Sequence, residues 1–348
     1  MRQRLAFAYP GNLELKTGGY GYDREMIAGL RRLGWDIDLI ALGEGFPSPS
    51  FQALEKAEGR LSALPDGTLV MIDGLAFGVM DEWAKREEQR LKIVALVHHP
   101  LALETGVSEA DQSRLRSSER RALATTQHVF VTSPMTAREL IKNFAVPTAK
   151  VSVAVPGTVR QPKSHKAQND VPQILSVGSL TRRKGHDVLI ASLAMIVDLP
   201  WKTTIIGSPH LDPSVAAALA EQISALDLND RITLAGECEE LSAAYASADI
   251  FALASRYEGY GMVFAEALSY GLPIVACHTG AVPEVVPSEA GYLLPVDDVE
   301  ALASALKRLL MDPEDRARRA EAAASAGADL PSWTDTCTIL SNRLKALI

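Results

Sequence analysis

The sequence has few cysteines, and they form no pattern. Cys238, Cys277 and Cys337 are the only three among 348 residues, they are widely spaced, and none belongs to a C-x-x-C pair. An odd number of scattered thiols indicates neither a disulfide framework nor a zinc site. We therefore expect core or near-core thiols, a reducing compartment and a cytoplasmic protein.

Long apolar runs and a surplus of positive charge are also missing. No stretch approaches the roughly 20 continuous apolar residues that a membrane span needs. The opening residues, MRQRLAFAYPGNL, start basic, but Pro10 ends the apolar run early, so they predict a first strand rather than a signal peptide. The formal net charge of −8 argues against a nucleic-acid partner but not against a small anion held by a few local cations.

What the sequence does have is a regular alternation of strand-like and helix-like segments. Helical patterns, such as those over residues 20–33, 80–89 and 113–124, separate short β-branched or apolar runs. This order predicts parallel sheets with right-handed crossovers, covered on both faces. The expected strands are 5–10, 36–42, 68–74, 91–99, 128–133, 151–157, 173–180, 202–208, 231–237, 250–255 and 273–278.

A polar segment at 160–170, RQPKSHKAQND, interrupts the alternation halfway and is interpreted as a linker. The fold class is therefore α/β with two Rossmann-like, doubly wound parallel-sheet domains. We expect an N-terminal domain over 1–160, a C-terminal domain over 171–328, and a C-terminal helix within 329–348. Ligands of such sheets bind outside the carboxyl ends of the strands, so a cleft between the domains is the expected site.

The segment 256–273, RYEGYGMVFAEALSYGLP, carries two glutamates, Glu258 and Glu266, across a glycine-containing loop. It is expected to be a strand exit, a loop and a helix that Gly271 ends. Glycines let a backbone approach a ligand, and a helix start favours an anion, whereas carboxylates bind hydroxyl groups strongly. Together these features indicate a nucleotide sugar; the alternative is a solvated loop residue and an ordinary helix-face residue.

The same segment, extended to RYEGYGMVFAEALSYGLPIVACHTGAVPEVV, resembles the E-x7-E region of the retaining glycosyltransferases of family 4, which have the GT-B fold. The resemblance runs over nearly the whole chain. It implies that Glu258 contacts the donor sugar and Glu266 the ribose. It also implies that loop and helix-start amides bind the sugar and diphosphate, from Gly259, Tyr260, Gly261, Met262 and Val263.

Other matching segments extend the implied site. In ILSVGSLTRRKGHDVLI, Lys184 matches the lysine that neutralises the donor diphosphate. Many members carry arginine where this chain has Ser179, so Arg182 or, preferably, Arg183 is expected to supply the second positive charge.

In the N-terminal half, KTGGYGYDREMIAGLRRLG resembles the first glycine loop of the family, which places Gly18 and Gly19 near the donor phosphate or the acceptor. VALVHHPLALETG places His98 against the reacting sugar, and a histidine that only caps the sheet is the alternative. His99 is expected to be structural. The implied catalytic residues are thus Glu258, His98 and Lys184.

No metal or other cofactor is expected. The DID string at Asp36–Asp38 matches a metal-binding D-x-D pattern, but it lies within an expected strand, where alternation puts both carboxylates on one polar face. No H-E-x-x-H motif, His/Cys cluster or G-x-S-x-G elbow is present.

The resemblance implies transfer of a hexosyl group, with retention, from a UDP- or GDP-linked sugar to an acceptor hydroxyl. The acceptor is a sugar, a glycolipid or another hydroxyl compound in polysaccharide, glycolipid or glycoconjugate synthesis. The alternatives are a catalytically silent sugar-nucleotide-binding protein, a GT-B epimerase and a phosphorylase, which would need pyridoxal phosphate.

One more segment bears on location. RLRSSERRAL places four arginines, Arg114, Arg116, Arg120 and Arg121, within a short helical stretch. Such a basic face suits peripheral contact with the inner face of a membrane, although a solvated helix face is the commoner explanation.

Overall fold

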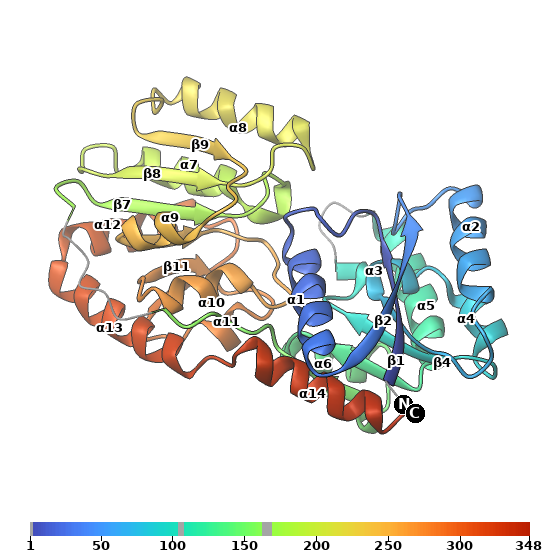
Figure 1. The fold of residues 1–348 in the computed structure, drawn as a ribbon. Coiled ribbons are helices and arrows are strands. Elements are labelled where there is room, and N and C mark those ends of the chain that lie inside the picture. The colour runs from blue at the N-terminus through green and yellow to red at the C-terminus, as the bar shows by residue number, and fades with distance from the viewer. Residues whose placement is uncertain (1–2, 104–107, 162–168) are drawn as a thin grey trace. The chain divides into compact units, whose positions relative to one another are not determined.

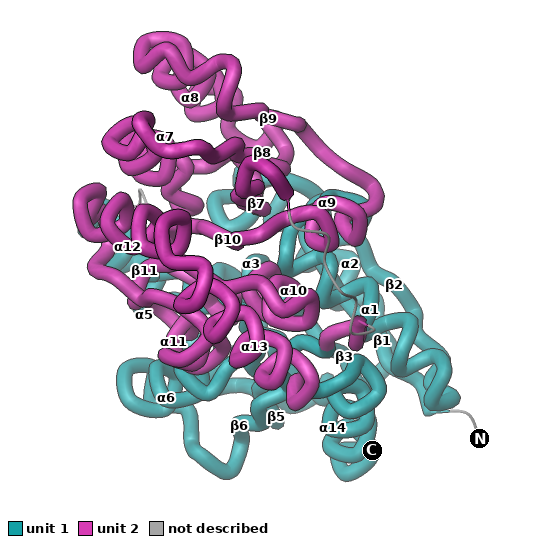
Figure 2. Tube along the Cα trace, turned by 90° about the vertical axis from the view of Figure 1, so that its left-hand side faces the viewer, with its two compact units in different colours: residues 1–157, 331–348 teal, residues 158–330 magenta. Residues whose placement is uncertain are grey.

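The computed structural model describes residues 3–103, 108–161 and 169–348. The chain forms two compact units, one of residues 1–157 and 331–348 and the other of residues 158–330 (Figure 2). Most of the expected linker, residues 162–168, lies outside the described residues. Both units are α/β, and in the part of the chain that is described each contains one six-stranded parallel sheet. The prediction of two doubly wound parallel-sheet domains is confirmed.

The first unit has the strand order β2-β1-β3-β4-β5-β6. Strands β1, β2 and β4 of this sheet are labelled in Figure 1. Its elements are β1 (Gln3–Pro10), α1 (Gly18–Arg32), β2 (Trp35–Gly43), α2 (Phe51–Ser62), β3 (Leu69–Asp73), α3 (Gly74–Phe77), α4 (Asp81–Glu87), β4 (Lys92–Val97), η1 (Leu101–Leu103), α5 (Glu109–Ala124), β5 (His128–Val131), α6 (Pro134–Asn143), η2 (Thr148–Lys150), β6 (Val151–Val153) and α14 (Trp333–Lys345).

The second unit has the strand order β12-β11-β10-β7-β8-β9. Its elements are β7 (Gln173–Val177), η3 (Arg182–Lys184), α7 (His186–Ala194), β8 (Lys202–Ile206), α8 (Pro213–Ala225), β9 (Ile232–Gly236), α9 (Ser242–Ser247), β10 (Ile250–Leu253), α10 (Met262–Ser269), β11 (Ile274–Cys277), α11 (Val282–Val285), β12 (Gly291–Leu294), α12 (Val299–Met311) and α13 (Pro313–Asp329). Strand β12 was not predicted, because its sequence, GYLL, begins with glycine and contains no β-branched residue.

The central strands are apolar because helices cover both faces of each sheet. Strands β3, β10 and β11 are buried along their whole length. Strand β2 lies at an edge, and its Asp36 and Asp38 are exposed and pair with Arg4 at 3.6 and 3.1 Å. The predicted polar side of the DID string is therefore confirmed.

The strand orders show where, in each sheet, the chain returns to its first strand and adds further strands on the other side. In the second unit the chain builds β7, β8 and β9 outward and then returns to add β10, β11 and β12 on the other side of β7. In the first unit the corresponding reversal lies between β1 and β3. The carboxyl ends of the strands at such a reversal are where doubly wound sheets bind ligands.

Helix ends follow the local sequence. Gly271 after α10 has φ +66° and its N–H bonds to Leu268 O at 2.9 Å, so the predicted glycine cap is present. Helix α14 starts with a capping box between Ser332 and Asp335. It belongs to the first unit, where the Trp35 indole donates to Ser341 Oγ at 2.9 Å. The C-terminal helix therefore packs on the N-terminal domain, as expected.

Two further expectations concern the cysteines and membrane-spanning helices. Cys277 and Cys337 are buried, Cys238 is half-buried, and these three described cysteines form no disulfide. Among the described helices, none combines the length and the apolar character that crossing a bilayer demands.

Candidate functional site

In the second unit, the loops after β7 and β10 form a cluster of charged side chains. These two strands are parallel neighbours at the reversal of the sheet, with Phe251 paired to Leu175. Lys184 lies seven residues after the end of β7, and Glu258 five residues after the end of β10. A backbone hydrogen bond of 2.8 Å from Arg256 N to Arg183 O joins the two loops. The topology therefore brings together two residues that are 74 positions apart in the sequence.

Glu258 is the centre of this cluster. Its Oε1 accepts hydrogen bonds from Lys184 Nζ at 2.7 Å and from Ser255 Oγ at 2.6 Å. Arg183 Nη1 lies 3.3 Å from its Oε2 and also donates to Tyr257 O at 3.0 Å. Glu258 is 5% exposed, so two cations and a carboxylate share a largely desolvated place.

The protonation of Glu258 follows from these neighbours. Burial alone would raise the pKa of Glu258, but the charges of Lys184 and Arg183 and the hydrogen bonds lower it to about 2. Glu258 is therefore ionised across the physiological range. With both cations charged, the three side chains carry a net charge of +1, which suits an anionic ligand.

The helices that follow these loops begin without a side-chain cap. Gly185 precedes α7 with φ +64°, and Gly261 precedes α10 with φ +93°. In the same unit, α8, α12 and α13 are capped by aspartates, whereas α9 and α11 also begin without a side-chain cap. A helix start without a cap leaves backbone N–H groups for other acceptors, and the helix dipole favours an anion there.

Glycines also make room around the lysine. A Cβ atom on Gly178 would lie 3.1 Å from Lys184 Cδ, and one on Gly185 would lie 1.9 Å from Ala254 O. The close approach of η3 to the exit of β10 therefore requires glycine at 185, whereas a side chain at 178 would only displace the flexible chain of Lys184. The side chain of Lys184 passes Gly178 and reaches Glu258 Oε1 at 2.7 Å.

The other predicted glutamate, Glu266, lies on α10 and has a different partner. Its Oε2 accepts a hydrogen bond of 2.7 Å from the Tyr245 hydroxyl. Tyr245 is buried and stacks on Tyr270 with ring centroids 5.2 Å apart. Burial raises the pKa of Glu266, and the hydrogen bond from Tyr245 opposes the shift. Glu266 is thus held in one orientation by an aromatic scaffold.

The remaining donor-side candidates lie on the same loop and helix start. Tyr260 is buried, and burial raises its pKa to about 12. Gly259, Met262 and Val263 are half-buried, whereas Gly261 is buried. Ser179 is half-buried, and of the two arginines considered in its place, Arg183 lies beside Glu258 while Arg182 is exposed.

In the first unit, His98 immediately follows β4 and faces two carboxylates. Its Nε2 lies 3.3 Å from Asp23 Oδ1 and 3.5 Å from Asp73 Oδ2. Asp23 comes from α1, which follows β1, and Asp73 is the last residue of β3. Burial would lower the pKa of His98, but the two carboxylates raise it above its ordinary value. Gly19 lies beside the ring, since a Cβ on it would be 3.6 Å from His98 Cδ2, whereas Gly18 has open space.

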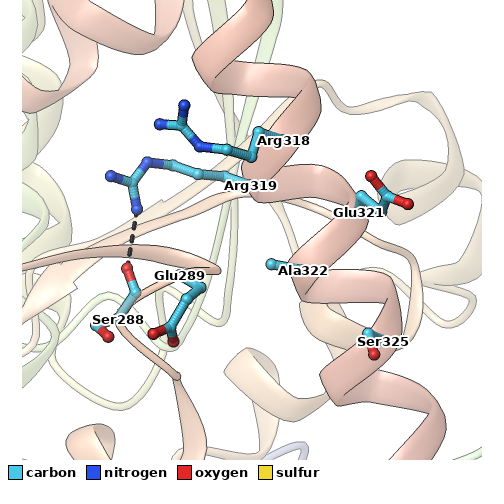
Figure 3. Close-up of a pocket in the computed structure, with 7 residues that line it drawn as sticks. All are labelled: Ser288, Glu289, Arg318, Arg319, Glu321, Ala322 and Ser325. Carbon is cyan, nitrogen blue, oxygen red and sulfur yellow. Dashed lines mark hydrogen bonds between the residues drawn. The ribbon is translucent and has the colours of Figure 1, made fainter.

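A hollow elsewhere in the second unit is a weaker candidate. It is lined by Ser288, Glu289, Arg318, Arg319, Glu321, Ala322 and Ser325 (Figure 3). Arg319 donates to Ser288 O at 2.9 Å, and both arginines pair with Asp315. Ser288 and Glu289 precede β12, so the hollow borders the amino end of a strand, opposite to where such sheets bind ligands.

The four arginines expected on one helical stretch lie on α5 and are mostly engaged within the protein. Arg121 pairs with Asp81 at 2.6 Å, and Arg114 with Asp111 at 3.5 Å. Arg116 lies over the Phe144 ring at 5.7 Å from its centroid. Membrane contact through this helix stays a prediction.

Several residues of these clusters were not anticipated from the sequence. They are Asp23, Asp73, Tyr245, Ser255 and Arg256. Asp73 could have been noticed, because it is a carboxylate at the carboxyl end of a buried strand. Asp23 and Tyr245 lie within helices, and nothing local separates them from ordinary buried polar side chains.

Comparison with known proteins points to one group of enzymes. Residues 159–326, just under half of the chain, match the family "Glycosyl transferases group 1". A D-inositol 3-phosphate glycosyltransferase of Corynebacterium urealyticum is 31% identical over 214 residues, which cover 58% of this chain and 50% of that protein. The chain spans about half the length of several curated relatives that it matches.

Solved structures extend the similarity to the whole fold. The sucrose-phosphate synthase of Thermosynechococcus elongatus has a TM-score of 0.84 at 23% identity, with 99% of each chain covered. Anabaena HepE in complex with UDP and glucose has a TM-score of 0.76 at 16% identity, covering 98% of this chain and 99% of that one. The fold is therefore the GT-B fold of glycosyltransferases.

Proposed function

We propose that this protein, whose second unit carries a group 1 glycosyltransferase domain, transfers a hexosyl group from a nucleotide sugar to an acceptor hydroxyl. The observation that carries the proposal is the cluster of Lys184, Arg183 and Glu258 at the reversal of the second sheet. Cations beside two uncapped helix starts suit a diphosphate, and the nearby carboxylates suit sugar hydroxyls.

In this proposal Lys184 and Arg183 neutralise the diphosphate, and the amides at the starts of α7 and α10 bind its oxygens. A fixed cation at a departing diphosphate stabilises the negative charge that develops as the glycosidic bond breaks. The Lys184–Glu258 contact holds the lysine in place before the donor arrives. A diphosphate then shares the lysine with Glu258, and we propose that Glu258 also binds the sugar.

Glu266 takes the ribose hydroxyls in this account. Its carboxylate is fixed by Tyr245, so it can accept two ribose O–H groups without losing side-chain freedom on binding. This role suits UDP- or GDP-linked donors, which both carry a ribose. HepE has been solved with UDP and glucose, which supports a uridine nucleotide as the first to test.

We further propose that the reaction keeps the anomeric configuration. No carboxylate needs to attack the sugar if the diphosphate itself accepts the proton of the incoming hydroxyl on the same face. Positive charge is supplied by side chains and helix starts, so the proposal needs no metal. The acceptor is a sugar, glycolipid or other hydroxyl compound of polysaccharide or glycoconjugate synthesis.

The test is a panel of UDP-, GDP- and ADP-hexoses examined for thermal stabilisation and for transfer. A donor at 100 times its dissociation constant adds about 2.7 kcal/mol to the free energy of unfolding. We expect one nucleotide class to stabilise the wild type and Glu258→Gln to abolish transfer, while Glu239→Gln, an exposed glutamate outside the cluster, changes neither. Transfer at the wild-type rate in Glu258→Gln would refute the assignment, and proton NMR of the product reports its anomeric configuration.

A further inference from the structure

The first unit contains a buried group of charges that the donor site does not explain. Asp23, Asp73 and His98 converge at the reversal of the first sheet, from α1, from the end of β3 and from the residue after β4. Asp23 is 0% exposed, and its Oδ2 is buried without a hydrogen-bond partner. A buried carboxylate with an unpartnered oxygen is costly unless a positive charge lies beside it.

We propose that Asp23 and Asp73 are positioning residues that hold His98 as an imidazolium, with its Nε2–H directed to both carboxylates and its Nδ1–H presented to the ligand. Nε2 is the ring atom near both carboxylates, at 3.3 and 3.5 Å. Among the described residues, the hydrogen bonds to the ring involve Nε2 alone. The side chain is 19% exposed, so part of its surface is accessible to a ligand.

Charge explains why the imidazole should keep its second proton. Burial raises the pKa of Asp23 to about 7, His98 opposes the shift and Asp73 adds to it. Above that pH a neutral ring would leave two carboxylates together in a buried place with no counter-ion among the described groups that face them. The groups facing the ring are Asp23 and the ring of Tyr22 from α1, and Asp73 from the end of β3. Tyr20 of α1 adds only a neutral hydroxyl, which donates to Pro10 O at 2.8 Å. No described cation competes with His98 for the two carboxylates.

The orientation of the His98 ring is also fixed, by Asp73 and Tyr22. Asp73 Oδ1 accepts the Leu75 N–H at 2.7 Å as the cap of α3, so this carboxylate cannot swing away. Tyr22 packs against the ring in an edge-to-face contact at 5.4 Å and is itself tied to Ala154 O at 2.9 Å. The result is a cationic donor of fixed direction, suited to a hydroxyl or a partly negative oxygen of the ligand. This chemical role rests on the proposed function, whereas the charge state does not.

The experiment measures the charge on His98 directly, by NMR of the intact protein labelled with ¹⁵N and ¹³C in histidine. The chain has seven histidines, and His98→Asn identifies the signal that belongs to position 98. We expect His98 to stay doubly protonated up to pH 8 without any donor. We expect Asp23→Asn to lower its titration midpoint by more than one pH unit, and Asp73→Asn to lower it as well. Asp36→Asn, an exposed carboxylate of β2, should leave it unchanged.

Three outcomes overturn the proposal: a wild-type midpoint near 6.5, no shift in either variant, or a His98 signal that changes when EDTA is added. The last would mean that the three groups hold a divalent ion. If Asp23→Asn does not fold, Asp73→Asn carries the test, since asparagine can still cap α3. The measurement needs no substrate, so its result is independent of the proposed function. A protein without transferase activity can still show a charged His98, and an active transferase can show a neutral one.

Discussion

Glu119 provides a stability test that is independent of any substrate. This residue of α5 is 1% exposed, and its Oε2 accepts the Leu101 N–H at 3.0 Å. Its Oε1 is buried without a partner. Burial raises the pKa of Glu119 from 4.5 to about 8, although the Leu101 N–H and the charge of Arg116 oppose the shift. Glu119 thus holds the start of η1, three residues after His98 in the sequence. The unfavourable consequence is that a carboxyl group is buried.

The sign of the pH effect follows from the raised pKa. The folded protein keeps the proton of Glu119 up to about pH 8, whereas the unfolded chain loses it above its ordinary value of 4.5. The stabilising contribution is therefore full below pH 4.5 and declines as the pH rises toward 8. The loss is about 1.4 kcal/mol per pH unit, or about 2 kcal/mol between pH 6 and 7.5.

Glu119→Gln removes this dependence, because an amide accepts the Leu101 N–H and never ionises. We expect the free energy of unfolding of the variant, relative to wild type, to rise by about 2 kcal/mol between pH 6 and 7.5. Urea denaturation at both pH values measures it, with Glu55→Gln, an exposed residue of α2, as the control. A difference that does not vary with pH would show that Glu119 is ionised in the folded protein and refute the reasoning.

Two further predictions concern the second unit. Tyr245→Phe removes the hydroxyl that fixes Glu266, and we expect nucleotide affinity measured by calorimetry to fall about five- to tenfold, as for one lost buried hydrogen bond. Tyr292→Phe loses a comparable hydrogen bond to Asp315 and should bind normally; equal affinity in both variants would contradict the role of Tyr245. Gly185→Ala should lower the free energy of unfolding by more than Gly236→Ala, because both glycines have positive φ but only the first would meet a backbone atom, Ala254 O at 1.9 Å. Urea denaturation measures the free energy of unfolding of both variants. Equal decreases would show that η3 can move away from Ala254 without loss of stability.

The fold was largely predictable because its signal is local and repeated. Alternation of apolar runs and helical patterns located strands β1 to β11, and the glycine at 271 marked the end of α10. Strand β12 was missed because the run Gly291–Leu294 begins with glycine, has no β-branched residue and is only partly buried. Its place is fixed by pairing with β11, which is information that a single segment does not contain.

The clusters were predictable only where a segment had a recognisable motif. Glu258 and Lys184 were singled out separately, yet their direct contact depends on the register of β7 against β10. Asp23, Asp73 and His98 come from three segments between positions 23 and 98, and no spacing within any one of them indicates that they meet. Such long-range contacts between buried charges are decided by sheet order, so the sequence alone indicated the histidine but not its two carboxylates.

The central claim is that Lys184 and its neighbours bind and release the diphosphate of a nucleotide sugar. The most direct measurement is the rate at which the nucleoside diphosphate appears from the stabilising donor, for wild type, Lys184→Met and Lys307→Met, an exposed lysine of α12. The account predicts release by wild type and Lys307→Met, and a fall of at least 100-fold in Lys184→Met, since one charge-stabilising donor is worth about 2.7–4 kcal/mol. Release at an equal rate by all three proteins would contradict it.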